Sequence, residues 1–133
     1  MDIPLDQLDT IVPFSQHLGI HFLAAQPDEV IGELALTSEL GNFAGTMHGG
    51  ALMSLADTIG STCAFLNLPP NTYTTTTDSS TRFLRPISDG MATATARPLR
   101  VGRTSIIVEV EIRDDTGRLA TKTSMAQAVL PNA

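Results

Sequence analysis

The stretch HGGALMSLADTIGSTCAFL, residues 48–66, decides the fold of this chain. Its large apolar side chains recur every three or four positions, which places them on one face of an α-helix. That face comprises Leu52, Leu55, Ala56, Ile59, Cys63 and Leu66. We therefore expect one long helix over residues 48–66 that packs this face against a sheet.

The opposite side of the same helix is small and weakly polar. Gly50, Ser54, Ser61 and Ala64 surround a single carboxylate, Asp57. An exposed helical face normally carries Lys, Arg, Glu or Gln, and this side carries none of them. Asp57 is therefore either a solvated residue or a functional carboxylate that a ligand or a second helix approaches. We favour the functional interpretation, because unpaired acids are rarely buried without a function.

The segments on either side of this helix predict an antiparallel sheet. Residues 4–12 and 13–19 each begin with Pro and predict two brief helices. Strands are expected at 20–26, 29–37, 72–84, 90–101, 104–113 and 118–129. Turn signals between them favour mostly consecutive hairpins, so the sheet should be antiparallel and bury one face on the helix. The predicted fold class is α+β, with a single domain over residues 1–133 and about six strands around one long helix.

Composition and charge exclude several classes of function. Hydrophobic residues make up 42% of the 133-residue chain and charged residues 17%, as in ordinary globular proteins. No apolar run approaches the roughly 20 residues of a membrane span, and the acidic N-terminus does not resemble a secretion signal. We therefore expect a cytoplasmic protein with no membrane partner. The first 81 residues contain nine acids and no base, which makes nucleic acid a poor partner.

The cysteine and histidine content gives no sign of a disulfide or a metal site. Cys63 is the only cysteine, so no intramolecular disulfide is available, and we expect it to be an inert core residue. His17, His21 and His48 are scattered and lack the paired spacing of metal ligands. The sequence implies neither a metal nor another cofactor.

The His-Gly-Gly start of the helix indicates a place where negative charge could be stabilised. The first turn of a helix presents unpaired N–H groups and the positive end of the helix dipole. A glycine there lets a substrate oxygen come close to the backbone, as in an oxyanion hole. A glycine-rich helix start without a function is the alternative. The carboxylate of Asp57 further along the helix favours the oxyanion interpretation, with Gly49 as the donor.

Gly49 and Asp57 are too far apart to act on one atom within a single chain. Eight residues span about 12 Å along a helix, whereas a general base acts within about 3 Å of its proton. Two helices lying antiparallel about a twofold axis would bring Gly49 of one chain to Asp57 of the other. The spacing therefore predicts a homodimer with two composite sites.

Three segments carry a resemblance to a known family. They are NFAGTMHGGALMSLAD at 42–57, TTDSSTRFLRP at 76–86 and RVGR at 100–103. Together they resemble the hotdog-fold acyl-CoA thioesterases of the phenylacetate-degradation type, and the N-x(5)-H-G-G-x(6)-D spacing is the most specific part. The resemblance covers residues 42 to about 125. It implies a sheet wrapped around the helix, an acyl-CoA substrate, and homodimers that often pair again into tetramers.

The same resemblance implies roles for individual residues. Asp57 matches the catalytic carboxylate, which would either activate water or attack the thioester carbonyl itself. Gly49 matches the backbone donor to the thioester oxygen, and Asn42 matches the polar group beside that oxygen. Thr76 matches a hydroxyl that helps to position water in the same subunit as the carboxylate. His48 and Gly50, at the start of the helix, are expected near the substrate.

The arginines predict where the anionic end of coenzyme A would bind. All eight basic residues follow residue 81. We expect Arg100 or Arg103 to contact the nucleotide phosphates, with Phe83 lining the approach, because forked guanidinium donors suit phosphate. Arg85 and Arg97 are substitutes for this role. The alternative for each arginine is a solvated charge at the end of a strand.

Three other functions share parts of this pattern. A hotdog hydratase or dehydratase would rely on a histidine paired with an acid and on a Pro-Gly-marked helix start, and the latter is absent from the sequence. A non-catalytic acyl-CoA-binding protein would keep the groove but has little need of Asp57. A structural dimer module needs neither the carboxylate nor the glycines. We therefore expect hydrolysis of an acyl-CoA with an aromatic or medium-chain acyl group, and fold alone does not decide this.

Overall fold

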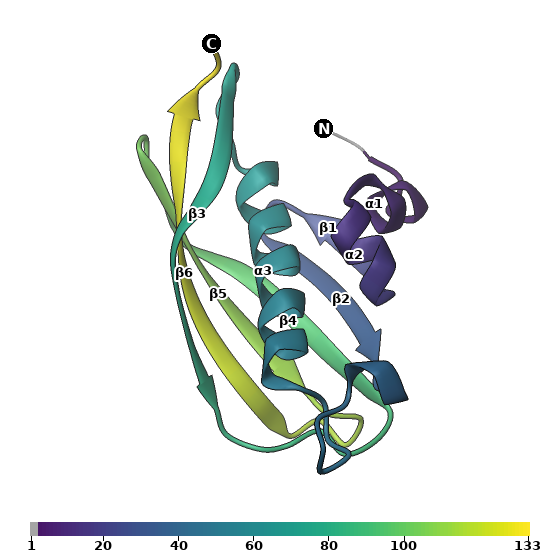
Figure 1. The fold of residues 1–133 in the computed structure, drawn as a ribbon. Helices are drawn as coiled ribbons and strands as arrows, with labels where there is room; N and C mark the ends of the chain where they lie inside the picture. Colours follow the sequence, from purple (N-terminus) through teal and green to yellow (C-terminus); the bar gives the residue numbers. More distant parts are fainter. Residues whose placement is uncertain (1–2) are drawn as a thin grey trace.

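The computed structural model describes residues 3–133 and is built around the long helix α3 (Gly49–Leu66), for which His48 is the N-cap. A curved antiparallel sheet of six strands wraps around α3 (Figure 1). The elements are α1 (Leu5–Ile11), α2 (Pro13–Leu18), β1 (His21–Gln26), β2 (Glu29–Ala35), η1 (Ser38–Leu40), α3, β3 (Thr72–Phe83), β4 (Met91–Val101), β5 (Ser105–Arg113) and β6 (Leu119–Pro131). The expected α+β architecture and its helix are confirmed.

The order of the strands differs from a simple run of hairpins. The sheet runs β1-β2-β4-β5-β6-β3. The expected consecutive pairing holds for β1–β2, β4–β5 and β5–β6, but it is wrong for β3, which pairs with β6 at one edge. Side-chain size accounts for this exchange. Strand β4 presents the small, fully buried Ala92, Ala94 and Ala96 beneath the helix, whereas the Thr- and Ser-rich β3 suits a half-solvated edge.

The apolar face of α3 is buried as expected. Leu55 and Ile59 are fully buried, and so are the alternating residues of β5 from Ile106 to Ile112. Full burial of each such side chain contributes roughly 1.5–3 kcal/mol to folding. The helix lies very close to the sheet at Gly60, where a Cβ would stand 2.4 Å from the sulfur of Met125. The packing of this face therefore fixes how α3 is rotated.

One residue of the small, polar side of α3 is placed differently. The sequence places Ala64 on the small, weakly polar side of the helix, opposite the apolar face, but Ala64 is fully buried. The sheet curves around to this side of the helix, since Ser61, one turn earlier, contacts Thr76 of the edge strand β3 and Gln127 of its neighbour β6. The small residues in the second half of α3 therefore pack against β3 and β6.

The N-terminal helices lie beside β1, on the opposite side of α3 from β3 (Figure 1). The carboxylate of Asp9 connects them to the sheet, because it accepts a hydrogen bond from the Phe22 N–H at 2.7 Å and pairs with the His21 ring. Helix α2 ends at Gly19, whose φ of 89° lies in the left-handed region that glycine adopts easily. These contacts place Phe14 of α2 near α3.

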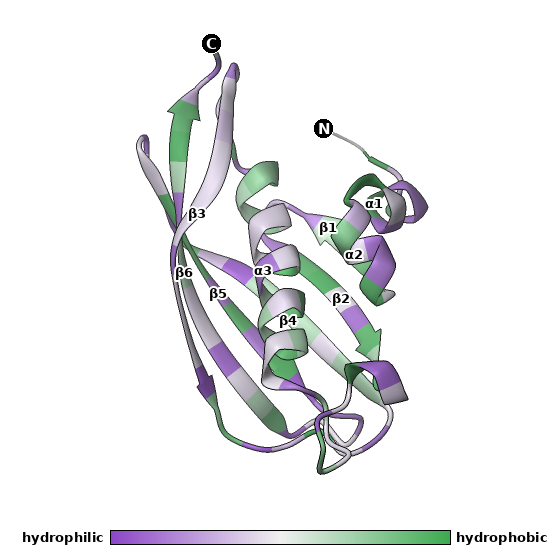
Figure 2. Cartoon of the chain, viewed as in Figure 1, coloured by the Kyte–Doolittle hydropathy of each residue, from purple (hydrophilic) through white to green (hydrophobic). Residues whose placement is uncertain are grey.

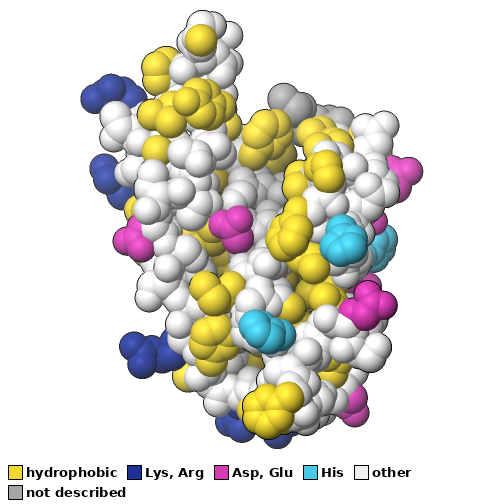
Figure 3. Space-filling view, in the orientation of Figure 1, with side chains coloured by type: hydrophobic (Ala, Val, Ile, Leu, Met, Phe, Trp, Pro, Cys, Tyr) yellow, Lys and Arg dark blue, Asp and Glu magenta, His cyan; other side chains and the backbone are white. Residues whose placement is uncertain are grey.

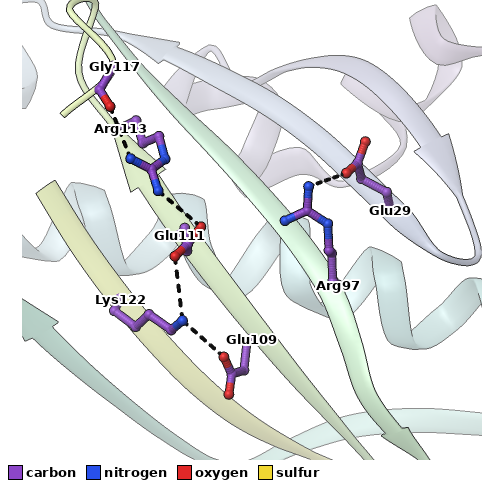
Figure 4. Close-up of polar contacts among 7 residues, drawn as sticks. All are labelled: Glu29, Arg97, Glu109, Glu111, Arg113, Gly117 and Lys122. Carbon is purple, nitrogen blue, oxygen red and sulfur yellow. Dashed lines mark hydrogen bonds and ion pairs between the residues drawn. The ribbon is translucent and has the colours of Figure 1, made fainter. Parts of the chain in front are cut away.

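The outer face of the sheet carries its charges in ion pairs. Lys122 lies between Glu109 and Glu111, and Arg113 also contacts Glu111 (Figure 4). Arg97 pairs with Glu29 across β2 and β4. Figure 2 shows the alternation of purple and green along β2 and β5 that accompanies this two-sided arrangement. Within residues 3–133, no helix combines the length and apolar character needed to cross a membrane.

Candidate active site

Asp57 lies on the side of α3 that faces away from the sheet core, and it is exposed in the single chain. It borders a groove of about 270 Å³ together with Phe14, Met53 and Ser79. No described residue forms an ion pair with it. A single chain therefore leaves this carboxylate open to solvent.

The hydroxyl of Thr76 is the direct partner of Asp57. Thr76 Oγ1 donates a hydrogen bond of 2.9 Å to Asp57 Oδ1. The structure thus brings together two of the four residues that the resemblance marked as catalytic. A hydrogen bond to a carboxylate stabilises its ionised form and fixes its orientation.

A bulge in β3 helps to set this contact. Thr76 faces Gln127 of β6, and the register then shifts before Asp78. The extra residue, Thr77, donates its hydroxyl hydrogen to the Ala126 carbonyl oxygen at 3.2 Å. A bulge changes which side chains point to each face of a strand. Both Thr76 before it and Ser79 after it therefore face α3.

Behind Thr76 lies a residue that the sequence did not indicate as functional. Gln127 is fully buried, and its Nε2 donates to Thr76 Oγ1 at 2.7 Å. Its Oε1 accepts a hydrogen bond from Thr74 at 3.3 Å. A polar residue at an inward-facing position of β6, where its neighbours are apolar or Thr, was the signal that could have revealed it.

The other candidate group, the Gly49 N–H, lies at the start of α3. Within residues 3–133 it has no hydrogen-bond acceptor, whereas the next N–H, that of Gly50, donates to His48 Nδ1 at 2.8 Å. Gly49 borders a groove of about 320 Å³ with Asn42, Phe83 and Arg85. The free N–H at the positive end of the helix dipole can therefore bind an oxygen that carries negative charge.

His48 and Gly50 have a structural task at this point. The His48 ring accepts the Gly50 N–H and so caps the helix, which removes Gly50 from the set of free donors. The ring has no carboxylate partner among the described residues. This arrangement does not supply the oriented histidine that hydratase or dehydratase chemistry would need.

Asn42 borders the Gly49 groove, and its amide also holds the preceding loop. Its Oδ1 accepts the N–H groups of Ala44 and Thr46, and its Nδ2 donates to Thr46 Oγ1 at 2.8 Å. Gly45 completes the turn with a φ of 84°. The amide nitrogen carries a second hydrogen, so Asn42 retains one donor beside the groove.

The structure separates Arg100 and Arg103 from Phe83. Phe83 lies opposite Thr121 of β6, whereas the loop that carries Arg103 lies beside Val129, whose N–H bonds to the Thr104 carbonyl oxygen. These two points are eight residues, or about 26 Å, apart along the strand. Arg100 and Arg103 therefore do not lie beside Phe83 within one chain, and their expected contact with the nucleotide stays a prediction.

Of the two substitutes, only Arg85 is close to the candidate site. It borders the Gly49 groove and forms no ion pair with any described residue, whereas Arg97 is paired with Glu29 on the outer face. In Figure 3 the Lys and Arg side chains lie at the margins of this face, away from the hollow between β3 and the helices. Among the described residues, Arg85 is the arginine that lines the groove of the free Gly49 N–H.

The two halves of the site remain apart in the single chain. The Gly49 groove and the Asp57 groove share no lining residue. Their separation of about 12 Å along α3 exceeds the reach of a general base. One chain carries the groups for acyl transfer but does not bring them to the same reacting atom.

Comparison with known proteins assigns the chain to a family. The sequence profile of the thioesterase superfamily matches residues 44–121. A Mycobacterium tuberculosis protein named as an esterase is 33% identical over 118 residues, which cover 86% of this chain and 84% of that protein.

Solved structures agree with this assignment. A thioesterase from Haemophilus influenzae superposes with a TM-score of 0.91 at 27% identity, covering 98% of this chain and 93% of that one. The PaaI protein of the Escherichia coli phenylacetic acid degradation operon gives 0.85 at 20% identity, covering 96% and 91%, which shows a common fold alone. The chain therefore belongs to the thioesterase superfamily of hotdog proteins and is a hydrolase of the thioester or ester type.

Proposed function

We propose that this protein hydrolyses acyl-CoA thioesters as a homodimer in which each site combines Asp57 of one subunit with the Gly49 N–H of the other. The observation that carries the proposal is the unpaired Gly49 N–H on the same helix as an exposed carboxylate that has no charged partner. Among residues 3–133, the Gly49 N–H meets no acceptor and Asp57 meets no cation. Both fit the needs of acyl transfer, which are a donor for the oxyanion and a base or nucleophile.

The proposed chemistry begins with the thioester oxygen at the start of α3. The Gly49 N–H, with the spare Asn42 N–H beside it, stabilises the negative charge that develops on that oxygen. The ionised Asp57 carboxylate either removes a proton from an attacking water or attacks the carbonyl carbon itself. The C–S bond then breaks and the CoA thiolate leaves and takes up a proton. In the second route water hydrolyses the resulting anhydride.

The dimer follows from the exposed elements around Asp57. Strand β3 is a 12-residue edge strand whose outer side is unpaired, and such an edge is a ready place for a second copy to add its own strand. Pairing of two β3 strands about a twofold axis would set the two α3 helices antiparallel and cover Asp57. The family resemblance extends this proposal to a dimer of dimers.

The same arrangement suggests how the two ends of the substrate bind. Phe14 and Met53 are exposed apolar side chains beside Asp57, and they would contact an aromatic or medium-chain acyl group. Arg85 would meet the CoA phosphates at the Gly49 groove. In an antiparallel dimer the Arg100 and Arg103 end of one chain lies toward the Gly49 end of the other, so these arginines would reach the nucleotide only across the interface.

The activity is tested with a panel of acyl-CoA thioesters, measured by release of free thiol. Asp57→Asn keeps the shape of the side chain and should lower kcat by about 10²-fold or more, the usual scale for a lost general base. An Asp57→Asn enzyme that retains the wild-type rate on every active thioester would refute the proposed mechanism.

The shared site is tested with hybrid dimers. Asp57→Asn chains mixed with Gly49→Pro chains, each inactive alone, should regain activity because one of the two sites in a hybrid is intact. Differently tagged chains establish that subunits have exchanged. Hybrids that form without recovering activity would rule out sites shared between chains.

A further inference from the structure

The fully buried amide of Gln127 is hydrogen-bonded at both ends. Its Oε1 accepts from Thr74, and its Nε2 donates to Thr76 at 2.7 Å and lies 3.5 Å from Ser61 Oγ. An apolar side chain is easier to bury, because an amide loses its hydration and needs a partner for each polar atom. The presence of this buried amide is therefore explained by the side chains that it hydrogen-bonds, and not by packing.

The direction of these hydrogen bonds is set by Asp57. An ionised carboxylate can only accept, so the single hydroxyl hydrogen of Thr76 must point to Asp57 Oδ1. The Thr76 oxygen then needs a donor, and the amide NH₂ of Gln127 is one that cannot act as an acceptor. The Gln127 oxygen in turn faces the Thr74 hydroxyl. All three bonds are thus oriented toward the carboxylate.

We propose that Gln127 is a positioning residue, which acts through Thr76 to hold Asp57 Oδ1 and leaves Oδ2 free to face the substrate. The inference rests on the proposed function of Asp57, and it adds a residue two hydrogen bonds away from that carboxylate. Without the amide donor, the Thr76 hydroxyl can rotate away from Asp57 and donate its hydrogen to the side chain that replaces Gln127, to Ser61 or to water. Asp57 then loses its fixed orientation while the substrate groove keeps its shape.

The first test replaces the amide without changing its size. Gln127→Met removes both the donor and the acceptor, and we expect kcat to fall about tenfold, the scale of one lost hydrogen bond to a charged group. KM should change less than twofold, because Gln127 does not border the groove. Gln127→Glu serves if the Met variant does not fold. A carboxylate at this position competes for the Thr76 hydrogen, so kcat should fall by at least as much.

Thr123→Val is the matched control. Thr123 is also a fully buried residue of β6, and it shares a 2.8 Å hydrogen bond with Thr81 of β3. Its removal disturbs the same pair of strands without touching Thr76 or Asp57. We expect a comparable loss of thermal stability and a kcat within twofold of the wild-type value.

The decisive test is a double-mutant cycle with Thr76→Val. If Gln127 acts through the Thr76 hydroxyl, Gln127→Met in a Thr76→Val background should lower kcat less than twofold further. Thr76→Ser, which keeps the hydroxyl, should retain the full tenfold dependence on Gln127. A purely structural Gln127 would lower kcat by the same factor in every background, and that outcome would overturn the inference.

Asp57→Asn measured in the same series separates the two proposals. An active Asp57→Asn enzyme would refute the proposed function itself. If Asp57→Asn is inactive, the positioning role alone would be overturned by either of two results. One is that the kcat effects of Thr76 and Gln127 are independent. The other is that kcat of Gln127→Met equals that of Thr123→Val.

Discussion

Replacement of Gly49 by proline removes the N–H donor and adds the three carbons of the proline ring. Gly49 is the first residue of α3, where proline is well tolerated because the N–H has no partner within the helix. The preceding residue must be extended when proline follows, and His48 already has φ −60° and ψ 137°. The structure therefore predicts that Gly49→Pro folds normally.

The expected effect on catalysis is much larger than the effect on stability. Loss of one oxyanion donor lowers kcat by about 10²–10³-fold, or roughly 2.7–4 kcal/mol of transition-state stabilisation. The Gly49 N–H has no acceptor in the described chain, so no internal hydrogen bond is lost. We expect the free energy of unfolding to change by less than about 1 kcal/mol, or on the order of 4 °C in Tm.

Gly49→Ala is the matched control, since it keeps the N–H and adds the same Cβ. That atom would stand 3.3 Å from the Phe83 ring, which is half exposed and free to shift by a few tenths of an ångström. Thiol release gives kcat and KM, and thermal melts compare the folded states. Equal kcat values for the proline and alanine variants would refute the oxyanion role of Gly49, since only one of them retains the donor.

Two further expectations concern the charges. Arg85→Gln should raise KM for an acyl-CoA by about fivefold, more at low salt, and should leave KM for an acyl-pantetheine unaffected. The control Arg97→Gln, on the outer face, should change KM for neither ester. Equal effects of Arg85→Gln on both esters would exclude a phosphate contact. The hydrogen bond to Asp9, followed by the negative charge of Asp9, raises the pKa of His21 above 6.5. The Asp9–His21 pair therefore stabilises the fold fully below pH 6.5, and its contribution is lost as the pH rises through the raised pKa. Urea melts across that range should show this decline in the wild-type protein and not in His21→Gln, and parallel curves would contradict it.

Local patterns in the sequence were enough to predict most elements of the fold. The three- and four-residue spacing of Leu52, Leu55 and Ile59 defined α3 and its buried face, because an amphipathic helix must cover its apolar side. Alternation between Ile106 and Ile112 likewise identified β5. Periodicity, however, does not report which strands become neighbours. The pairing of β3 with β6 depends on the small alanines of β4 fitting beneath the helix, which is a property of the assembled layers.

The candidate site divides in the same way. Asp57 and Gly49 could be found from the sequence because both belong to one helix, whose geometry follows from residue spacing. Gln127 could not, since it is 51 residues from Thr76 and meets it only because β3 crosses to the far edge of the sheet. The positions of the arginines were also beyond the sequence, because the sheet register places Arg85 beside Gly49 and Arg103 at the other end of β6. Local hydrophobic periodicity determined the elements, whereas long-range pairing and close packing decided which polar groups meet, because those contacts depend on residues far apart in the chain.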